Sequence, residues 1–529
     1  MKYSLYKLYF EQQKMIYSTL NKCIIRDNFV DGQVWIPKSL LPDIEKVLRD
    51  IFNGKERKLT AQLTDIDNEN EEEIPPTYIK TNEFTSVFQQ IVDTYGIPHY
   101  REINPGYFTI ITFPFLFGVM FGDICHGLVL FCFGIYLCFN NKIIINSNSF
   151  LKSISFARYF VLLLGFFSVF CGLLYNDFAS IPLNLKTCYP KEGEKYDSLK
   201  KNEYCENEFG LDPVWMSSSN ELMFVNSLKM KLSVILGVSH MILGIILKGL
   251  NSLFERDMVE FIFVFIPQIV LMCILFGYMD VLIFIKWSIN YKDKEYRAPD
   301  IKTLLMNIFL KAGSLPDEPK KGEDWIFYAD KKKMESLHFY ILITALRCIF
   351  IMFLPKVLIN YCKAKNKYEK MNAKNIGAIN DENEEDEKIN QDQLIQQNAN
   401  LQDQQPLFSD FFVASVIETI EFVLGTVSNT ASYLRLWALS LAHSQLSVVF
   451  FSKSIAKFGS ISESSIINGL VVSYIFILFA LVTLGVLLFM DLMECALHTL
   501  RLHWVEFQNK FYKADGYLFK PFCFEQTIN

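Results

Sequence analysis

The sequence predicts an all-α membrane protein of about eight transmembrane helices, the last two long and tilted, with a small N-terminal α+β lobe. Of its 529 residues, 51% are hydrophobic and 15% are aromatic. The charged residues gather in residues 1–104, in two polar loops and in one acidic linker. The stretches between them are long and apolar, and a helix needs about 20 such residues to cross a bilayer.

Several function classes are excluded by what the sequence lacks. It has no basic cluster with interleaved aromatic residues, so we expect no nucleic-acid partner. Neither GxxxxGKS/T nor GxGxxG occurs, so no segment is suited to hold nucleotide phosphates. No nucleophile–base pair stands out, and the 12 cysteines show no CxxC or Cys/His spacing typical of zinc. We therefore expect no nucleotide site in this chain, and we assign it no cofactor and no metal ion.

Residues 1–104 are polar and are interpreted as a partial cytosolic domain. Helical patterns there mix with a strand-like segment at residues 32–36, which gives the expected α+β lobe. Acidic residues 69–73 run into Pro75 and Pro76, which is typical of a linker. The N-terminus lacks the apolar core of a signal peptide, so the first membrane helix is expected to direct targeting.

Eight apolar segments follow a junction at Asn104-Pro105-Gly106. They cover residues 107–121, 125–139, 157–175, 232–250, 261–287, 337–354, 411–450 and 466–490. The first six belong to a membrane region at 105–362 that has two lumenal loops, at 176–229 and 288–334. The last two belong to residues 407–512 and are expected to be long and tilted.

The seventh segment is too long for a helix that crosses a bilayer upright. Forty helical residues measure about 60 Å, twice the thickness of the hydrocarbon core. Such a segment either breaks into two helices or crosses at a steep tilt. It contains no proline, and its only interior glycine is Gly425. We therefore expect one tilted helix.

Lysine and arginine in short loops predict the orientation, because cytosolic loops carry an excess of both. Three loops lie on one side by this rule, with Lys142, Lys152 and Arg158, with Lys248 and Arg256, and with Lys363, Lys365, Lys367 and Lys370. Both termini, including the tail at 513–529, are then cytosolic. Residues 363–406 are rich in Asn, Gln, Glu and Asp and are expected to form a disordered cytosolic linker. Cys188 and Cys205 share one loop, and they either form a disulfide there or stay reduced.

Arg435 is the only charge between Glu421 and Lys453, inside the seventh segment. A guanidinium stays charged and is costly at membrane depth, so it normally faces a partner or a water cavity. Glu421, Ser428 and Arg435 recur every seven residues and drift by only about 20° per step around a helix. Three more residues lie within about 80° of Arg435 on the same wheel: Gly425, Ser432 and His443. The stripe is either a wet proton pathway or an ion pair that fixes helix packing.

The eighth segment repeats this pattern near its end. Asp491, Glu494, His498 and Arg501 share one helix face at spacings of three and four. Carboxylates, histidines and arginines along a helix face are typical of a proton path, since a histidine gains and loses its proton near neutral pH. The alternative is that Arg501 and His503 only mark the membrane boundary.

Two further groups of polar residues lie near membrane segments. Asp123 and His126 either cap the turn between the two short helices or join the pathway. Lys229 and Lys231 are interpreted as interfacial anchors beside the fourth helix.

A proton path beside a fixed arginine predicts a specific coupling mechanism. A carboxylate on a moving partner must lose its proton to pass an immovable positive charge. If two aqueous half-channels open on opposite faces of the membrane, the arginine also blocks a direct proton leak between them. Motion and proton flow are then coupled.

Long motifs identify a family resemblance. They are Pro75-Pro-Thr-Tyr78, Thr81-Asn-Glu-Phe-Thr85, Tyr100-Arg-Glu-Ile-Asn-Pro105, Ile111-Thr-Phe-Pro-Phe115, Phe121-Gly-Asp123, residues 428–447 and residues 500–512. By these residues the chain resembles subunit a, the 116 kDa stator subunit in the membrane sector of vacuolar-type proton-translocating ATPases. The resemblance covers almost everything from residue 11 onward except the acidic linker.

The resemblance implies a non-catalytic stator beside a rotating ring of proteolipid subunits, with ATP hydrolysed on other subunits. It implies that Arg435 is the essential arginine facing the ring and that Asp123 is the acid near the lumenal exit. The family's half-channel positions fall on Glu421, Ser428, His443, Asp491, His498 and Arg501. Implied partners are the proteolipid c-type ring, other membrane-sector subunits, peripheral stalk subunits and the lipid bilayer. The implied location is the membrane of an acidic organelle (vacuole, endolysosome or Golgi) or the plasma membrane.

Three features depart from the family pattern. The family's cytosolic N-terminal part is several hundred residues long, so the chain resembles a member with a shortened N-terminal part. Position 491 is aspartate where many members have glutamate, and Glu494 adds an acid that the pattern does not require. Two other functions stay open: a scaffold that assembles or targets the same complex, and an autonomous ion transporter, although no internal duplication typical of transporters is visible.

Overall fold

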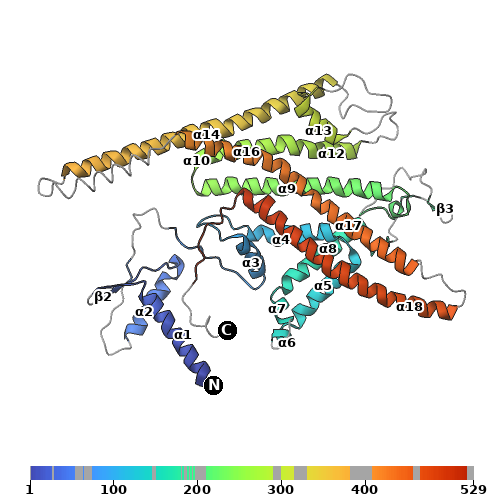
Figure 1. Cartoon of the computed structure of the whole chain (residues 1–529), viewed down its shortest axis with the longest axis horizontal. Helices are drawn as coiled ribbons and strands as arrows, with labels where there is room; N and C mark the ends of the chain where they lie inside the picture. Colours follow the sequence, from blue (N-terminus) through green and yellow to red (C-terminus); the bar gives the residue numbers. More distant parts are fainter. Residues whose placement is uncertain are drawn as a thin grey trace. The chain divides into compact units, whose positions relative to one another are not determined.

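The computed structural model describes most of the chain, and it is almost entirely helical (Figure 1). The described residues are 2–26, 29–53, 63–64, 74–145, 151–179, 181–183, 188–189, 191–192, 195–196, 210–289, 300–314, 331–381, 408–456 and 465–520. They divide into two compact units. One contains Met1–Thr81, Val92–Glu102 and Lys513–Asn529, and the other contains Asn82–Ile91 and Ile103–Tyr512.

The smaller unit combines short helices with one strand pair, as an α+β lobe would. Its elements are α1 (Lys2–Leu20), β1 (Ile24–Arg26), β2 (Phe29–Asp31), η1 (Lys38–Leu40) and α2 (Leu41–Asn53). The two strands are antiparallel, with Ile25 opposite Val30. The strand expected at residues 32–36 is therefore wrong, because the strand partner of β1 ends at Asp31 and a strand persists only where its backbone groups are paired.

The C-terminal segment also belongs to the smaller unit. The Thr77 amide donates a hydrogen bond of 2.7 Å to the Tyr517 carbonyl, and the Gly516 amide donates one of 3.1 Å to the Ile97 carbonyl. His99 Nδ1 lies 3.0 Å from Asp515 Oδ1. Residues close to the two ends of the chain therefore form one unit.

The larger unit contains the apolar helices. Their bounds are α3 (Ser86–Tyr95), α4 (Gly106–Phe121), α5 (Ile124–Phe139), α6 (Asn141–Ile145), α7 (Leu151–Ser155), α8 (Arg158–Tyr175), η2 (Pro213–Ser217), α9 (Glu221–Phe254), α10 (Met258–Glu260), η3 (Phe261–Phe265), α11 (Ile266–Met272), η4 (Cys273–Gly277), α12 (Tyr278–Ser288), α13 (Ile301–Leu310), α14 (Lys331–Asp381), α16 (Phe408–Ser432), α17 (Leu434–Phe451), η5 (Ser452–Ala456), α18 (Ser465–Val482), η6 (Thr483–Met490), α19 (Asp491–Arg501), η7 (Leu502–Phe507) and η8 (Gln508–Lys510). Two-residue strands, β3 (Lys191–Glu192) and β4 (Lys195–Tyr196), pair in the loop after α8.

Six helices in the described part of the chain are long and apolar enough to span a bilayer. They are Arg158–Tyr175, Glu221–Phe254, Met258–Ser288, Lys332–Lys370, Phe408–Ile455 and Gly469–Lys510. The first two expected crossings correspond to α4 and α5, which have 16 residues each and are shorter than a full span. Six of the eight expected crossings therefore correspond to helices of full length, and crossings by the two short helices α4 and α5 stay a prediction.

The seventh segment continues in one direction through two helices, with a single residue between them. Helices α16 and α17 follow each other in the same direction and meet at Tyr433 (Figure 1). Tyr433 keeps right-handed helical angles, with φ −67° and ψ −18°. The whole stretch Phe408–Ile455 has 48 residues, and a helix of that length measures about 70 Å, so a crossing requires a steep tilt.

The eighth segment extends well beyond the expected residue 490. The span Gly469–Lys510 has 42 residues and includes two π-helical stretches, η6 and η7. Residues 491–501 therefore continue the same long helix as α19 and do not follow its end.

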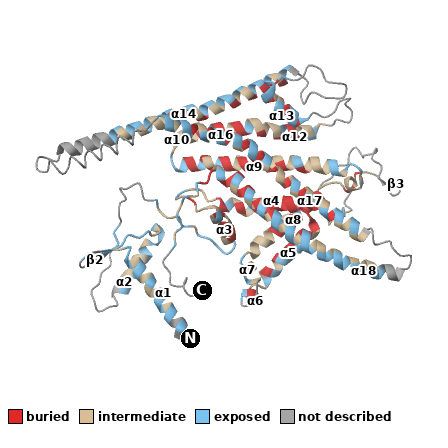
Figure 2. Cartoon of the chain, viewed as in Figure 1, coloured by how far each residue is buried: buried red, intermediate tan, exposed pale blue. Residues whose placement is uncertain are grey.

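Close helix packing positions the turn between α4 and α5. Figure 2 shows buried residues concentrated on α4, α8, α9 and α17. A Cβ atom added at Gly172 of α8 would lie 2.6 Å from the Ile124 amide nitrogen and 2.7 Å from the Asp123 carbonyl carbon. A Cβ at Gly165 would lie 2.5 Å from the Phe131 nitrogen. Small residues allow membrane helices this close approach.

Two predictions about loops are tested only in part, because each loop includes residues outside the described ones. Helix α14 continues through Asp381, into the expected disordered linker, because this stretch is rich in the good helix formers Lys, Glu, Ala and Met. Residues 382–407 lie outside the described residues. Cys188 is disulfide-bonded, and Cys205, its expected partner, lies outside the described residues.

Candidate functional site

The Asp123 side chain is fully buried at the start of α5. Its Oδ1 atom accepts hydrogen bonds from the Cys125 amide (2.8 Å) and the Ala179 amide (3.2 Å). Its Oδ2 atom lies 2.7 Å from His126 Nδ1. Asp123 thus caps the helix and leaves its second oxygen for other groups, so the two open interpretations of Asp123 and His126 are compatible.

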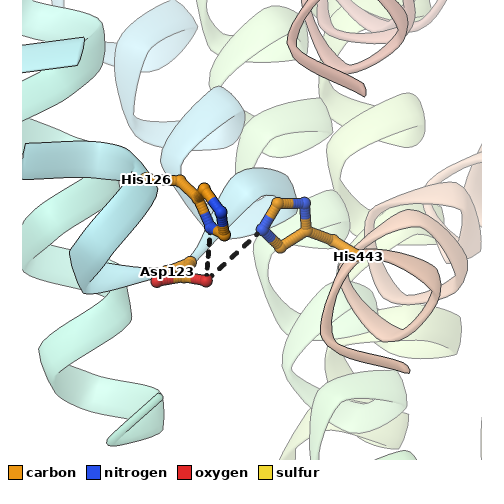
Figure 3. A group of neighbouring side chains, drawn as sticks. All are labelled: Asp123, His126 and His443. Carbon is orange, nitrogen blue, oxygen red and sulfur yellow. Dashed lines mark hydrogen bonds and ion pairs between the residues drawn. The ribbon is translucent and has the colours of Figure 1, made fainter. Parts of the chain in front are cut away.

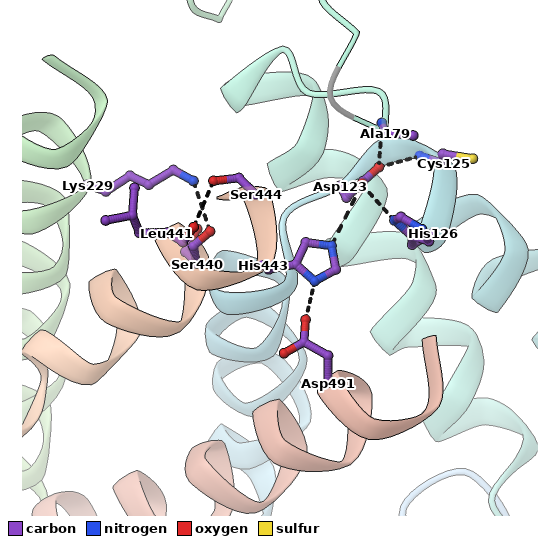
Figure 4. Close-up of polar contacts among 10 residues, drawn as sticks. All are labelled: Asp123, Cys125, His126, Ala179, Lys229, Ser440, Leu441, His443, Ser444 and Asp491. Atoms are coloured by element: carbon purple, nitrogen blue, oxygen red, sulfur yellow. Dashed lines mark hydrogen bonds and ion pairs between the residues drawn. The ribbon is translucent and has the colours of Figure 1, made fainter. Parts of the chain in front are cut away.

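His443 of α17 lies beside Asp123 (Figure 3) and also contacts Asp491 of α19 (Figure 4). Its Nδ1 atom is hydrogen-bonded to Asp491 Oδ2, and its Nε2 atom lies 3.7 Å from Asp123 Oδ2. That separation exceeds a hydrogen bond, and Nε2 has no hydrogen-bond partner among the described residues. We call Asp123, His126, His443 and Asp491 the buried cluster; each member is less than 10% exposed.

The buried cluster can hold and pass a proton. An imidazolium has one N–H for each of the two carboxylates that face His443, whereas a neutral ring has a single N–H. Histidine is the side chain whose proton exchanges most readily near neutral pH. Two carboxylates and two histidines in contact, at the meeting point of three helices, are therefore chemically suited to pass a proton.

Lys229 of α9 lies near the buried cluster and is itself buried. Its Nζ atom donates to the Ser440 carbonyl over 3.3 Å and lies 4.6 Å from the centre of the Tyr175 ring. Asp177 and Asp123 both stabilise its positive charge. Lys229 is thus more buried than a side chain that reaches toward water, and its place at the membrane interface stays a prediction. Lys231 is half-buried.

Arg435 occupies the start of α17 and is half-buried. Its Nη1 atom is buried and has no hydrogen-bond partner in the described part of the chain. No carboxylate among the described residues lies within ion-pair distance of it, while Glu506 attracts and Arg501 repels its charge at longer range. The described residues therefore do not show the ion pair of Arg435 that the alternative interpretation requires to fix helix packing.

The other predicted residues on α16 and α19 lie apart from the buried cluster. Glu421 and Ser428 are exposed on α16, and Lys510 exerts an electrostatic attraction on Glu421. His498 Nε2 lies 3.6 Å from Glu494 Oε1 on α19 and is repelled by Arg435 and Arg501.

Several buried polar residues were missed by the sequence reasoning. Glu506 is 1% exposed, with one carboxylate oxygen unpaired among the described atoms, and interacts with Ser432 and Arg435. Its signal in the sequence was an acid five residues after Arg501, within a motif quoted only for the family resemblance.

A histidine and a tyrosine form a second buried contact. His240 Nδ1 lies 2.7 Å from the Tyr433 hydroxyl oxygen, and the His240 ring stacks on Phe507 with centroids 4.2 Å apart. His503 sits beside them, with its Nε2 atom 2.9 Å from Thr112 Oγ1. His503 is therefore a buried packing residue, and its place relative to the membrane boundary stays a prediction. A single histidine within the apolar run of α9 was the only sequence signal for this contact.

Comparison with known proteins gives a consistent result. The model of the V-type ATPase 116kDa subunit family matches residues 1–524. The chain is 37% identical over 541 residues to V-type proton ATPase 116 kDa subunit a 1 of Mus musculus, covering 97% of this chain and 63% of that protein. It is 38% identical over 556 residues to V-type proton ATPase subunit a3 of Arabidopsis thaliana, covering 100% of this chain and 62% of that protein.

A fungal relative extends the comparison. The chain is 34% identical over 548 residues to V-type proton ATPase subunit a, Golgi isoform, of Saccharomyces cerevisiae, covering 98% of this chain and 59% of that protein. The chain thus spans about three fifths of the length of the curated relatives that it matches. With a family model that matches nearly every residue, the chain belongs to the V-type ATPase 116kDa subunit family.

Proposed function

We propose that this chain is a proton-translocating stator subunit of a rotary V-type ATPase. It provides two half-channels and places Arg435 against a ring of proteolipid subunits, while ATP is hydrolysed on other subunits. The observation that carries the proposal is Arg435 itself, a permanent charge on a membrane-length helix with a buried, unpaired Nη1 atom. A charge left without a carboxylate partner in its own chain is suited to meet one on another chain.

Polar residues on either side of Arg435 support the two half-channels. Glu421 precedes it by 14 positions and His443 follows it by eight, so they lie about 21 Å and about 12 Å away along the helix axis. The buried cluster would serve the half-channel on the His443 side, which we place toward the lumen. Glu421 and Ser428 would serve the cytosolic one, and His498 and Arg501 would flank the arginine.

The exposed apolar surface of α18, η6 and α19 supports a membrane-embedded partner. Large side chains exposed there include Leu481, Leu484, Phe489, Met493 and Leu497. Such a surface is stable against lipid tails or against another membrane protein. A passing ring carboxylate would be favoured in its deprotonated form by Arg435 and would take up a proton beyond it.

The proposal includes the placement of the chain. The termini (residues 1–104 and 513–529) and the linker 363–406 would be cytosolic, and the loops 176–229 and 288–334 lumenal. Peripheral stalk subunits, other membrane-sector subunits and the bilayer would be its partners, in the membrane of an acidic organelle. Lysine-rich loops support the orientation, and the Golgi isoform among the relatives supports such an organelle.

The decisive experiment replaces Arg435 by glutamine in the protein that contains this chain. ATP-driven acidification of vesicles should be abolished, while the amount of assembled complex changes little. Arg347→Gln is the matched control, because Arg347 is an exposed arginine in another membrane-length helix, α14, and should retain acidification. Retained pumping by Arg435→Gln would refute the mechanism.

Two further outcomes separate the alternatives. Binding of proteolipid subunits without any rescue of acidification by the wild-type chain would favour an assembly or targeting scaffold. Substantial proton conduction by the chain reconstituted alone would favour an autonomous transporter.

A further inference from the structure

We propose that Asp123, His126 and His443 form a binding site for a zinc ion. The three residues each offer one ligand atom, and these atoms all lie within 4.8 Å of one another (Figure 3). All three side chains are buried, and they come from two parts of the chain more than 300 positions apart. The site rests on geometry alone, and its effect on proton flow rests on the proposed function.

The distances are close to those of a zinc site. Zinc binds imidazole nitrogen and carboxylate oxygen at about 2.0–2.2 Å, so ligand atoms around a tetrahedral ion lie about 3.3 Å apart. Asp123 Oδ2 lies 2.7 Å from His126 Nδ1 and 3.7 Å from His443 Nε2. These two separations fall on either side of the ideal value, and the third pair, His126 with His443, lies within 4.8 Å. Small side-chain shifts must therefore bring all three ligand atoms to the separations of a tetrahedral site.

The free atom that a metal requires is present. His443 Nε2 is buried, faces the site and has no hydrogen-bond partner among the described residues. A buried nitrogen left unpaired is costly, and coordination would satisfy it.

The groups around the three ligands match the surroundings of metal sites. A histidine that binds a metal usually donates its other ring N–H to a carboxylate, and His443 Nδ1 is hydrogen-bonded to Asp491 (Figure 4). Asp123 Oδ1 is held by the Cys125 and Ala179 amides, which leaves Oδ2 directed at the two histidines. Both contacts fix the ligands before a metal arrives.

The ligand set favours zinc over harder cations. Two imidazoles and one carboxylate suit zinc, whereas calcium needs six to eight oxygen ligands and magnesium prefers carboxylates, phosphates and water. Three protein ligands also leave a fourth position for water. A bound ion would occupy the Asp123 oxygen and the His443 nitrogen that the proposed relay uses, so zinc should inhibit proton flow.

The test measures zinc bound to the chain purified in detergent with the subunits that co-purify. X-ray absorption at the zinc edge should show two imidazoles and oxygen ligands in the wild type. His126→Ala should lower zinc affinity at least tenfold. His99→Ala is the matched control, since it also removes one of the seven histidines but lies outside the membrane helices, and it should leave zinc binding unchanged.

A rescue variant keeps the test decisive if His126→Ala misfolds. His126→Cys should bind zinc and add a sulfur ligand at about 2.3 Å to the absorption spectrum. Equal zinc binding in all variants, or a His126→Cys spectrum without sulfur, would overturn the site.

A separate measurement tests inhibition. Zinc should slow ATP-driven acidification by the wild type, and calcium at the same concentration should not. If zinc bound at this site without slowing acidification, the predicted inhibition would be refuted, but the binding site itself would stand. If Arg435→Gln retained pumping, the proposed function would fail while the binding result would still decide the zinc site.

Discussion

Replacing Gly172 by alanine tests whether the α5–α8 contact places Asp123. The new Cβ atom would lie 2.6 Å from the Ile124 nitrogen, where ordinary contacts begin near 3.4 Å. Backbone atoms cannot rotate away, so α8 must move by about 0.8 Å, and overpacking of this kind costs about 1–3 kcal/mol. Alanine also gains about 1 kcal/mol over glycine inside a helix, so the net loss should be about 0–2 kcal/mol.

Gly485→Ala is the matched control for this prediction. A Cβ at Gly485 meets nothing within 4 Å, so this variant should show only the gain of about 1 kcal/mol in helix stability. The difference between the two variants isolates the packing cost of about 1–3 kcal/mol.

The assay is unfolding of the purified chain in bicelles, with acidification measured in parallel. Gly172→Ala should lose acidification beyond its loss of stability, because a shift in the α4–α5 turn moves Asp123 relative to His443. Equal stability of the two variants would refute the packing argument, and full acidification by Gly172→Ala would refute the link to Asp123.

Three further predictions concern buried polar contacts. Tyr433→Phe removes the hydroxyl that is hydrogen-bonded to His240 Nδ1 and should lower the free energy of unfolding by about 1–3 kcal/mol, measured in bicelles; an unchanged value would contradict a hydrogen bond there. Lys229→Met should change thermal stability far more than Lys231→Met, because Lys229 is buried and Lys231 is half-exposed, and equal shifts in melting temperature would count against this. Glu418→Gln breaks an ion pair with Lys356, and since the Glu418 side chain is 43% exposed the loss should stay below about 1 kcal/mol; a larger loss would show that the pair is shielded from water.

The sequence by itself determined the class of protein, the family resemblance and the polar helix faces. These features are local, because twenty apolar residues predict a spanning helix and seven-residue spacing predicts a shared face wherever the helix lies. It also indicated that Arg435 lacks a carboxylate partner close by on its own helix. The interruption at Tyr433 could not be predicted, since its residues are ordinary helix formers and the helical angles continue through it.

Only the tertiary structure decided which polar residues meet. Asp491 is paired with His443, which lies 48 positions earlier in the sequence. Asp123, in the turn between α4 and α5, lies close to the same histidine although more than 300 positions separate the two residues. Helical spacing gives the direction of a side chain relative to its own axis and says nothing about which helix faces it. Burial of Lys229 and of Glu506 depends likewise on the packing of α9, α17 and η7. Close approach at small residues, such as Gly172 of α8 against the turn that holds Asp123, is one contact that depends on how distant helices pack.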